Sequence, residues 1–75
     1  MSYKSHTYEP IVGDRIYNSN PNCKHYRSEG IVIDLVELPK DLGKTIRYIC
    51  TNSGKSWQEG DVLEKTPDQL SPHKI

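Results

Sequence analysis

Residues 30–38, GIVIDLVEL, decide the fold, because they form the longest apolar-rich stretch of the chain and carry β-branched residues on both faces. Ile31, Val32 and Ile33 follow one another, so neither face of the segment is purely polar. Such two-sided apolarity is typical of a strand that bends and contributes to two sheets. Gly30 provides a position for the bend or for the close approach of a neighbour. We therefore expect residues 30–38 to form a bent strand.

Strand patterns continue on both sides of this stretch. Residues 11–17 alternate, with Val12 and Ile16 on the expected buried face. Residues 39–44, PKDLGK, have turn composition, and residues 45–51 then resume a strand, so residues 30–51 predict a hairpin. In the second strand of that hairpin, Ile46, Tyr48 and Cys50 share one side. Two further short strands are expected at residues 56–58 and 61–65.

Glycine and proline mark the connections between these strands. Gly54 lies in the tight turn of residues 52–55, where we expect it to adopt positive φ. Gly-Asp occurs at residues 13–14 and again at residues 60–61, each time directly before a hydrophobic strand, and indicates a turn that leads into the strand. Thr66 and Pro67 stand at the N-cap and first positions of a single helical or 3-10 turn.

Together these patterns predict an all-β fold, a small five-stranded barrel with a short 3-10 turn near the C-terminus. No stretch of ten or more residues has helical periodicity. Closure into a barrel would remove the exposed sheet edges that promote aggregation. We expect a flexible N-terminal arm over residues 1–10, the barrel over residues 11–70 and a frayed C-terminus over residues 71–75.

Length and charge restrict the classes of function. A chain of 75 residues forms one small domain, and its ten basic and ten acidic residues leave no net charge to draw it to nucleic acid or a membrane. Residues 24–55 carry a local excess of two positive charges, and residues 56–75 an excess of two negative charges. No secretory signal or membrane-spanning pattern is present in the sequence. We expect a cytoplasmic protein whose Cys23 and Cys50 stay reduced.

The first strands resemble a known fold family. Residues 12–16, VGDRI, a loop, and then residues 30–32, GIV, resemble the opening of SH3-like barrels of the KOW type. The likeness covers about a third of the chain and implies an SH3-like barrel. KOW sequences also have glycines within the loop, and residues 18–29 of this chain have none.

A second resemblance covers most of residues 12–71. The segments NPNCKHYRSEGIV, LPKDLGKTIRYICTNSGKSW and GDVLEKTPDQL look like parts of small uncharacterised proteins of tailed phages that infect cyanobacteria. This resemblance implies a phage-encoded accessory protein that acts in the host cytoplasm or in the virion. It implies no particular activity.

The main candidate for a binding site is the loop at residues 18–29. It places Lys24, His25, Tyr26 and Arg27 in succession. The two basic side chains could contact phosphates, and the two rings could stack on unpaired bases. The same surface could instead bind a protein, or the loop could be a simple connection. Two basic residues are few for an interface led by phosphate contacts.

Three further residues join this candidate surface. Trp57 is the only tryptophan of a chain without phenylalanine, and it is either a core residue or an exposed anchor of a binding groove. Tyr48 and Lys55 would lie near it. The Gly54-Lys55-Ser56 triplet does not form a phosphate loop, because position 49 is isoleucine and a strand follows in place of a helix.

Metal binding and catalysis find little support. Cys23, His25 and Cys50, with His6 or His73, could supply zinc ligands, but the chain lacks the paired Cys-x₂-Cys spacing of structural zinc sites. Cys50 is better explained as a small buried hydrophobic residue. The histidines have no evident nucleophile with an orienting partner. We expect no cofactor, no metal and no enzyme activity.

The sequence therefore predicts a non-enzymatic binding module. Its leading partner is a protein, bound through the 18–29 loop with Tyr48, Lys55 and Trp57. A single-stranded nucleic acid is the alternative partner, and a structural role in the virion is a third possibility. A membrane partner is not expected.

Overall fold

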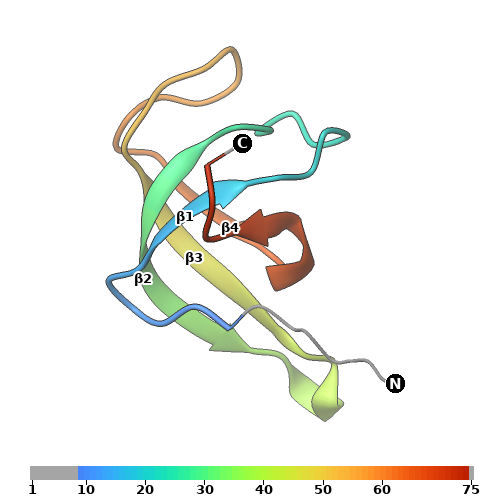
Figure 1. Cartoon of the computed structure of the whole chain (residues 1–75). Helices are drawn as coiled ribbons and strands as arrows, with labels where there is room; N and C mark the ends of the chain where they lie inside the picture. Colours follow the sequence, from blue (N-terminus) through green and yellow to red (C-terminus); the bar gives the residue numbers. More distant parts are fainter. Residues whose placement is uncertain (1–8, 75) are drawn as a thin grey trace.

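The structure, a computed structural model, describes residues 9–74. Its strands form one sheet in the order β4-β3-β2-β1-β5, and every neighbouring pair is antiparallel. They are β1 (Arg15–Asn18), β2 (Glu29–Glu37), β3 (Lys44–Cys50), β4 (Val62–Lys65) and β5 (Leu70–Ser71), with the 3-10 turns η1 (Pro39–Asp41) and η2 (Pro67–Gln69) between them (Figure 1). The predicted all-β fold with five strands is confirmed. Pairing does not join β4 to β5 within residues 9–74, so closure into a barrel stays a prediction.

The central strand, β2, is long and curved, as the apolar run predicts (Figure 1). The first half of β2 pairs with a strand on each side, since Arg15 of β1 stands opposite Ile31. From Gly30 to Glu37, β2 pairs with β3. The register against β3 shifts between Val32 and Asp34, so Ile33 is the extra residue of a bulge. The irregularity of β2 therefore lies at Ile33 and not at Gly30.

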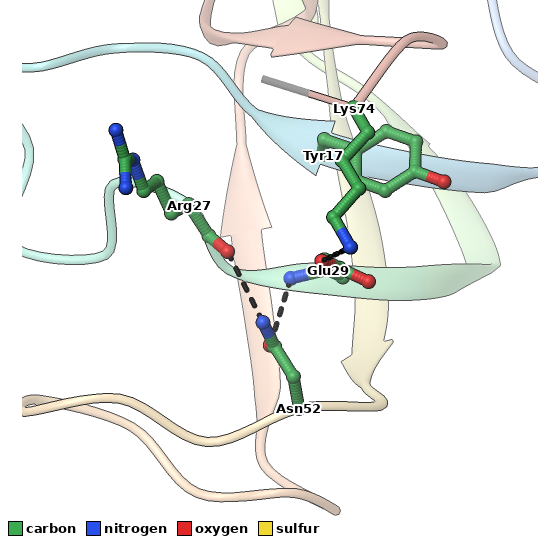
Figure 2. A pocket seen from close by; sticks show the side chains of 5 residues that line it. All are labelled: Tyr17, Arg27, Glu29, Asn52 and Lys74. Carbon is green, nitrogen blue, oxygen red and sulfur yellow. Dashed lines mark hydrogen bonds and ion pairs between the residues drawn. The ribbon is translucent and has the colours of Figure 1, made fainter.

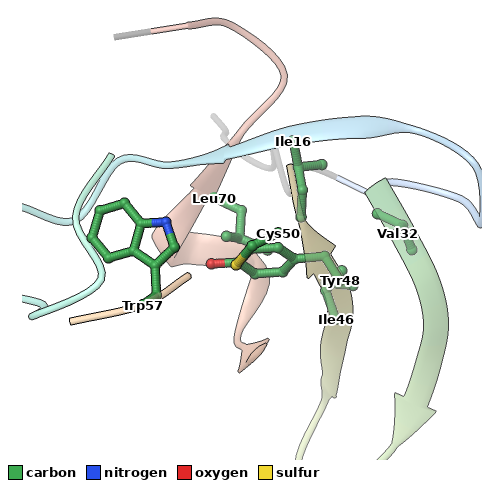
Figure 3. Close-up of a cluster of buried hydrophobic side chains, with 7 residues drawn as sticks. All are labelled: Ile16, Val32, Ile46, Tyr48, Cys50, Trp57 and Leu70. Atoms are coloured by element: carbon green, nitrogen blue, oxygen red, sulfur yellow. The ribbon is translucent and has the colours of Figure 1, made fainter. Parts of the chain in front are cut away.

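The core lies on one face of the curved sheet (Figure 3). The side of β3 that was expected to be buried is confirmed as such. The indole of Trp57 is only 8% exposed and covers one end of the cluster. Trp57 is therefore a core residue and not the exposed anchor of a groove. The buried hydrophobic residues are Ile16, Val32, Ile46, Tyr48, Cys50, Trp57 and Leu70.

The first Gly-Asp turn explains why one core prediction is wrong. Gly13 adopts φ 100°, N of Asp14 donates to O of Ile11 over 3.0 Å, and Oδ2 of Asp14 accepts from N of Ile11 over 3.0 Å. The turn then docks on β2, since N of Gly13 donates to O of Val32 (2.8 Å) and N of Val32 donates to O of Asp14 (2.9 Å). Val12 stands at the tip of this turn and is 59% exposed, so it does not share the buried face.

The second Gly-Asp turn repeats this construction at the opposite side of the sheet. Gly60 adopts φ 96°, and Asp61 bonds Gln58 through both its N–H and its carboxylate, each over 2.9 Å. The turn docks on Cys50 of β3 through two hydrogen bonds of 2.8 Å. N of Gly60 donates to O of Cys50, and N of Cys50 donates to O of Asp61. The prediction that Gly-Asp marks a turn leading into a strand is confirmed at both sites.

Two other glycines serve close contacts. A Cβ on Gly30 would lie 2.5 Å from O of Ile49 and 2.5 Å from Cδ2 of Tyr48, as expected for a close approach. Gly54 does not have the positive φ that was predicted for it. Its backbone lies under the ring of Trp57 instead, where a Cβ would be 2.3 Å from Cη2.

The C-terminal part differs from the expected strand list in one respect. Residues 56–58 are not a strand, because residues 51–60 form turns that carry Trp57 into the core. The fifth strand is β5, which follows the predicted 3-10 turn at Pro67 and pairs with β1. Of the predicted N-terminal arm, residues 1–8 lie outside the described residues, and Pro10 is buried.

The helical segments of residues 9–74 are the two 3-10 turns, and neither has the length or the apolar sequence to cross a membrane.

Candidate binding loop and its pocket

The connection between β1 and β2, here called loop 19–28, is shaped by its own asparagines. Oδ1 of Asn18 accepts from N of Asn20 over 2.9 Å, and Oδ1 of Asn20 accepts from N of Asn22 over 3.0 Å. Such Asx turns fold a chain locally without a regular element. Asn18 is fully buried, and its backbone closes the loop by bonding O of Ser28 (2.8 Å) and N of Arg27 (3.0 Å).

The same loop is fastened to the segment before β5. O of Gln69 accepts from N of Ser19 over 2.8 Å, and Oε1 of Gln69 accepts from Nδ2 of Asn20 over 3.1 Å. Gln69 is itself held, because its Nε2 donates to Oγ1 of Thr66 over 2.9 Å. Loop 19–28 is therefore positioned by a residue about fifty positions further along the chain.

Cys23 lies inside this loop and receives three hydrogen bonds on its sulfur. The donors are Nζ of Lys65 at 3.3 Å, N of His25 at 3.4 Å and Nδ2 of Asn18 at 3.6 Å. Partial burial acts to raise the pKa of the Cys23 thiol, but the bonds from His25, Lys65 and Asn18 and the charge of Lys65 outweigh it, so the pKa lies below its ordinary value. The thiolate of Cys23 is therefore more accessible than that of an unperturbed cysteine.

Asn52, in the turn after β3, connects the loop to the core. Its Oδ1 accepts from N of Glu29 at 2.9 Å and from Nε1 of Trp57 at 3.0 Å, while its Nδ2 donates to O of Arg27 at 3.2 Å. The Asn52 amide thus gives the indole N–H of Trp57 an acceptor. It also bonds the backbone of Arg27 and Glu29, where the chain passes from loop 19–28 into β2.

Arg27 is held in an unusual backbone conformation at the end of the loop. Its φ is 76°, in the left-handed region that residues other than glycine rarely adopt. The carbonyl bond to Asn52 and the N–H bond to Asn18 keep the residue there. The guanidinium is exposed, and its Cζ lies 5.4 Å from the centre of the Tyr26 ring, in reach of a cation–π contact.

A pocket of about 200 Å³ opens beside Arg27 (Figure 2). Nζ of Lys74 lies 3.6 Å from Oε2 of Glu29 across it. The lining joins β1, the end of the loop, the start of β2, the turn after β3 and the C-terminal segment, since its residues are Tyr17, Arg27, Glu29, Asn52 and Lys74. Its lining combines one aromatic ring, one amide and the Lys74–Glu29 ion pair, while the guanidinium of Arg27 points away from the other labelled side chains (Figure 2).

Of the sequence-predicted site residues, Arg27 lines the pocket, and three others lie at the same end of the sheet. Lys24 and Arg27 are exposed and Tyr26 is half-buried, all on loop 19–28. Lys55 is exposed in the connection between β3 and β4, which lies at the same end of the sheet as the loop (Figure 1).

Tyr48 and Trp57 are placed elsewhere. Tyr48 is fully buried, and its Oη lies 2.8 Å from Oγ of the equally buried Ser28. Trp57 meets His25 edge to face, with ring centres 6.3 Å apart and planes at 78°. These two residues stand beneath the loop and hold its base, so they do not present a surface to a partner.

His25 faces inward between the loop and the core. Burial, then the charges of Lys65 and Lys24, lower the pKa of its imidazole, and Asp61 acts in the opposite direction. Its Nδ1 is buried and has no hydrogen-bond partner within residues 9–74. The lowered pKa disfavours the charged imidazolium, and the inward-facing ring is not placed to stack on an exposed base.

Sequence reasoning missed four lining residues, Tyr17, Glu29, Asn52 and Lys74. Tyr17 alternates with the buried Ile16, which signals an outward side chain, but the other three come from unrelated segments and carry no local pattern. Among residues 9–74 no three His, Cys, Asp or Glu side chains are grouped to hold a metal ion.

Protein-family models, curated proteins and solved structures contain no significant match to this chain.

Proposed function

We propose that the chain is a non-enzymatic binding module that holds an acidic segment of a protein partner on loop 19–28 and the adjoining pocket. The observation that carries the proposal is the convergence of five chain segments on that pocket beside a fixed arginine. Arg27 is exposed, yet its backbone is locked in place by Asn18 and Asn52. A residue whose backbone is fixed before binding loses less conformational entropy when its side chain meets a carboxylate.

Charge and ring placement favour such a partner. Lys24, Arg27 and Lys74 present three cations at this end of the sheet, and within residues 9–74 only Lys74 of the three has an ion-pair partner, Glu29, at 3.6 Å. Tyr26 and Tyr17 add partly exposed aromatic surface of the kind that concentrates binding energy. The architecture that we propose for the module is an SH3-like barrel, supported by the curved β2 and by the pairing of β5 with β1 directly after a 3-10 turn.

The setting that we propose is the cytoplasm of an infected cell. The resemblance to small proteins of cyanobacterial phages supports it, and so does the reduced state of Cys23 and Cys50, which do not form a disulfide.

The test is affinity capture from host lysate with the immobilised protein. We expect proteins captured by the wild type to be lost with the Tyr26→Ala/Arg27→Ala double variant and retained with Arg15→Ala. Arg15 is an exposed arginine on β1, outside the pocket, and serves as the matched control. A double variant that folds and still captures every partner would contradict the proposal.

Single-stranded nucleic acid is the second candidate, favoured by the stacking of Arg27 on Tyr26 at 5.4 Å. Trp57 contacts His25 of the loop and so reports on it. A salt-sensitive change of Trp57 fluorescence on titration with single-stranded DNA or RNA, reduced by Lys24→Ala, would replace the protein partner by nucleic acid. Self-association on a sizing column, lost in the double variant, would instead favour the virion component.

A further inference from the structure

Cys23 has a reactive side-chain neighbour that the proposed binding of a partner does not involve. Its sulfur lies 3.3 Å from Nζ of Lys65, a residue of β4 that is 42 positions away in the sequence. Both side chains are partly exposed. The thiol and the amine thus stand side by side at a half-buried position of the surface.

Cys50 provides a contrast within the same chain. It is 2% exposed, in the core. Burial, followed by the nearby charge of Asp61, raises the pKa of its thiol. Because the thiolate is the form that reacts, Cys50 is protected from the chemistry that Cys23 is exposed to.

We propose that Cys23 and Lys65 form a reversible covalent bridge when the protein meets hydrogen peroxide. The thiolate attacks one peroxide oxygen, the O–O bond breaks, sulfur is oxidised to the sulfenic acid and the peroxide is reduced. The departing hydroxide takes a proton from the Lys65 ammonium, which leaves water and a free amine. Nζ then attacks Sγ, the S–N bond forms and the S–O bond breaks, and the hydroxide leaves as a second water with a proton from the nitrogen.

The reaction is balanced in atoms and charge. One thiolate, one ammonium group and one peroxide give one sulfenamide and two waters, and the only oxidant consumed is the peroxide. Thiol reductants reverse the bridge. Because Cys23 lies in loop 19–28 and Lys65 lies in β4, the bridge ties the loop to the edge strand of the sheet.

The experiment treats the reduced, full chain with one equivalent of hydrogen peroxide and follows the intact mass under denaturing conditions. We expect a monomer that has lost two hydrogens, and that regains them with dithiothreitol. Peptide mapping is expected to join the peptide of Cys23 to the peptide of Lys65. The same mapping separates this product from a disulfide between Cys23 and Cys50, which has the same mass and would overturn the proposal.

Two variants complete the test. Lys65→Arg keeps the positive charge beside the sulfur but offers a poor nucleophile, so its oxidation should stop at a sulfenic acid that dimedone captures. Cys50→Ala should form the bridge as the wild type does. Equal products in the wild type and Lys65→Arg, or sulfinic acid at Cys23 of the wild type without linked peptides, would show that no bridge forms.

Discussion

The indole Nε1 of Trp57 donates a 3.0 Å hydrogen bond to Oδ1 of Asn52, and the same oxygen accepts the N–H of Glu29 at 2.9 Å. The core and the start of β2 therefore share one acceptor. Asn52 also donates to O of Arg27 at 3.2 Å and lines the pocket itself, so a change at this amide alters the core and the pocket together.

Replacing Asn52 by alanine is expected to lower the free energy of unfolding by about 1–3 kcal/mol, because the buried indole N–H loses its partner. Urea unfolding followed by Trp57 fluorescence measures the loss. Asn22→Ala is the matched control, since no side-chain hydrogen bond of Asn22 is present within residues 9–74, and should stay within about 0.5 kcal/mol of the wild type. Equal stability of the two variants would argue against the role of Asn52.

Gly54→Ala is expected to destabilise the protein by about 1–3 kcal/mol, since the new Cβ would overlap the Trp57 ring and force it to move. The emission of Trp57 should shift to longer wavelength as the ring gains contact with water. Lys55→Ala, next in the chain and exposed, tests whether any change in this turn has the same effect. A Gly54→Ala variant with unchanged emission would mean that the ring does not lie on Gly54.

Tyr48 should make the protein sensitive to alkali. Burial raises the pKa of its phenol, while the hydrogen bonds with Ser28 and Asn18 act in the opposite direction. Because the folded-state pKa is raised, the contribution to stability is complete below the ordinary value of about 10 and is lost as the pH rises through the folded-state pKa.

The measurement is the free energy of unfolding as a function of pH. Tyr48→Phe should flatten the alkaline decline, although it costs about 1 kcal/mol near neutral pH by leaving Oγ of Ser28 unpaired. Ser28→Ala keeps the titrating phenol and should keep the decline. The same alkaline slope in wild type and Tyr48→Phe would assign the loss of stability to another group.

Arg27 offers a direct test of its backbone conformation. Glycine adopts φ 76° without strain whereas alanine does not, so Arg27→Gly should be more stable than Arg27→Ala by about 1 kcal/mol. Lys24, which lies in the same loop without positive φ, should show no advantage of glycine over alanine. Thermal unfolding of the four variants makes the comparison, and a lower melting temperature for Arg27→Gly than for Arg27→Ala would contradict it.

The sequence predicts the strands better than the site, for physical reasons. Alternation along β3 identifies Ile46, Tyr48 and Cys50 as one buried face, because side chains of a strand alternate between two environments. The same rule fails at Val12, since the positive φ of Gly13 turns the chain before the strand begins. Alternation predicts which side of a strand is buried, but it does not predict where a turn interrupts the strand.

The pocket could not be predicted because its residues meet only through tertiary structure. Tyr17 and Lys74 are far apart in the sequence, and pairing of β1 with β5 brings their segments together. Local clustering of Lys24, His25, Tyr26 and Arg27 predicts a binding loop, but it gives equal weight to His25, whose ring faces Trp57.

The bonds from Ser19 and Asn20 to Gln69 can form only after residue 69 has been synthesised. A nascent chain can form the hairpin of β2 and β3 as soon as Cys50 leaves the ribosome, because that pairing is local. The loop bonds within residues 18–52 can form at about that stage too, whereas the two bonds to Gln69 are added only when residue 69 is present. A chain that ends before Gln69 would therefore carry the binding loop without its attachment to the segment before β5.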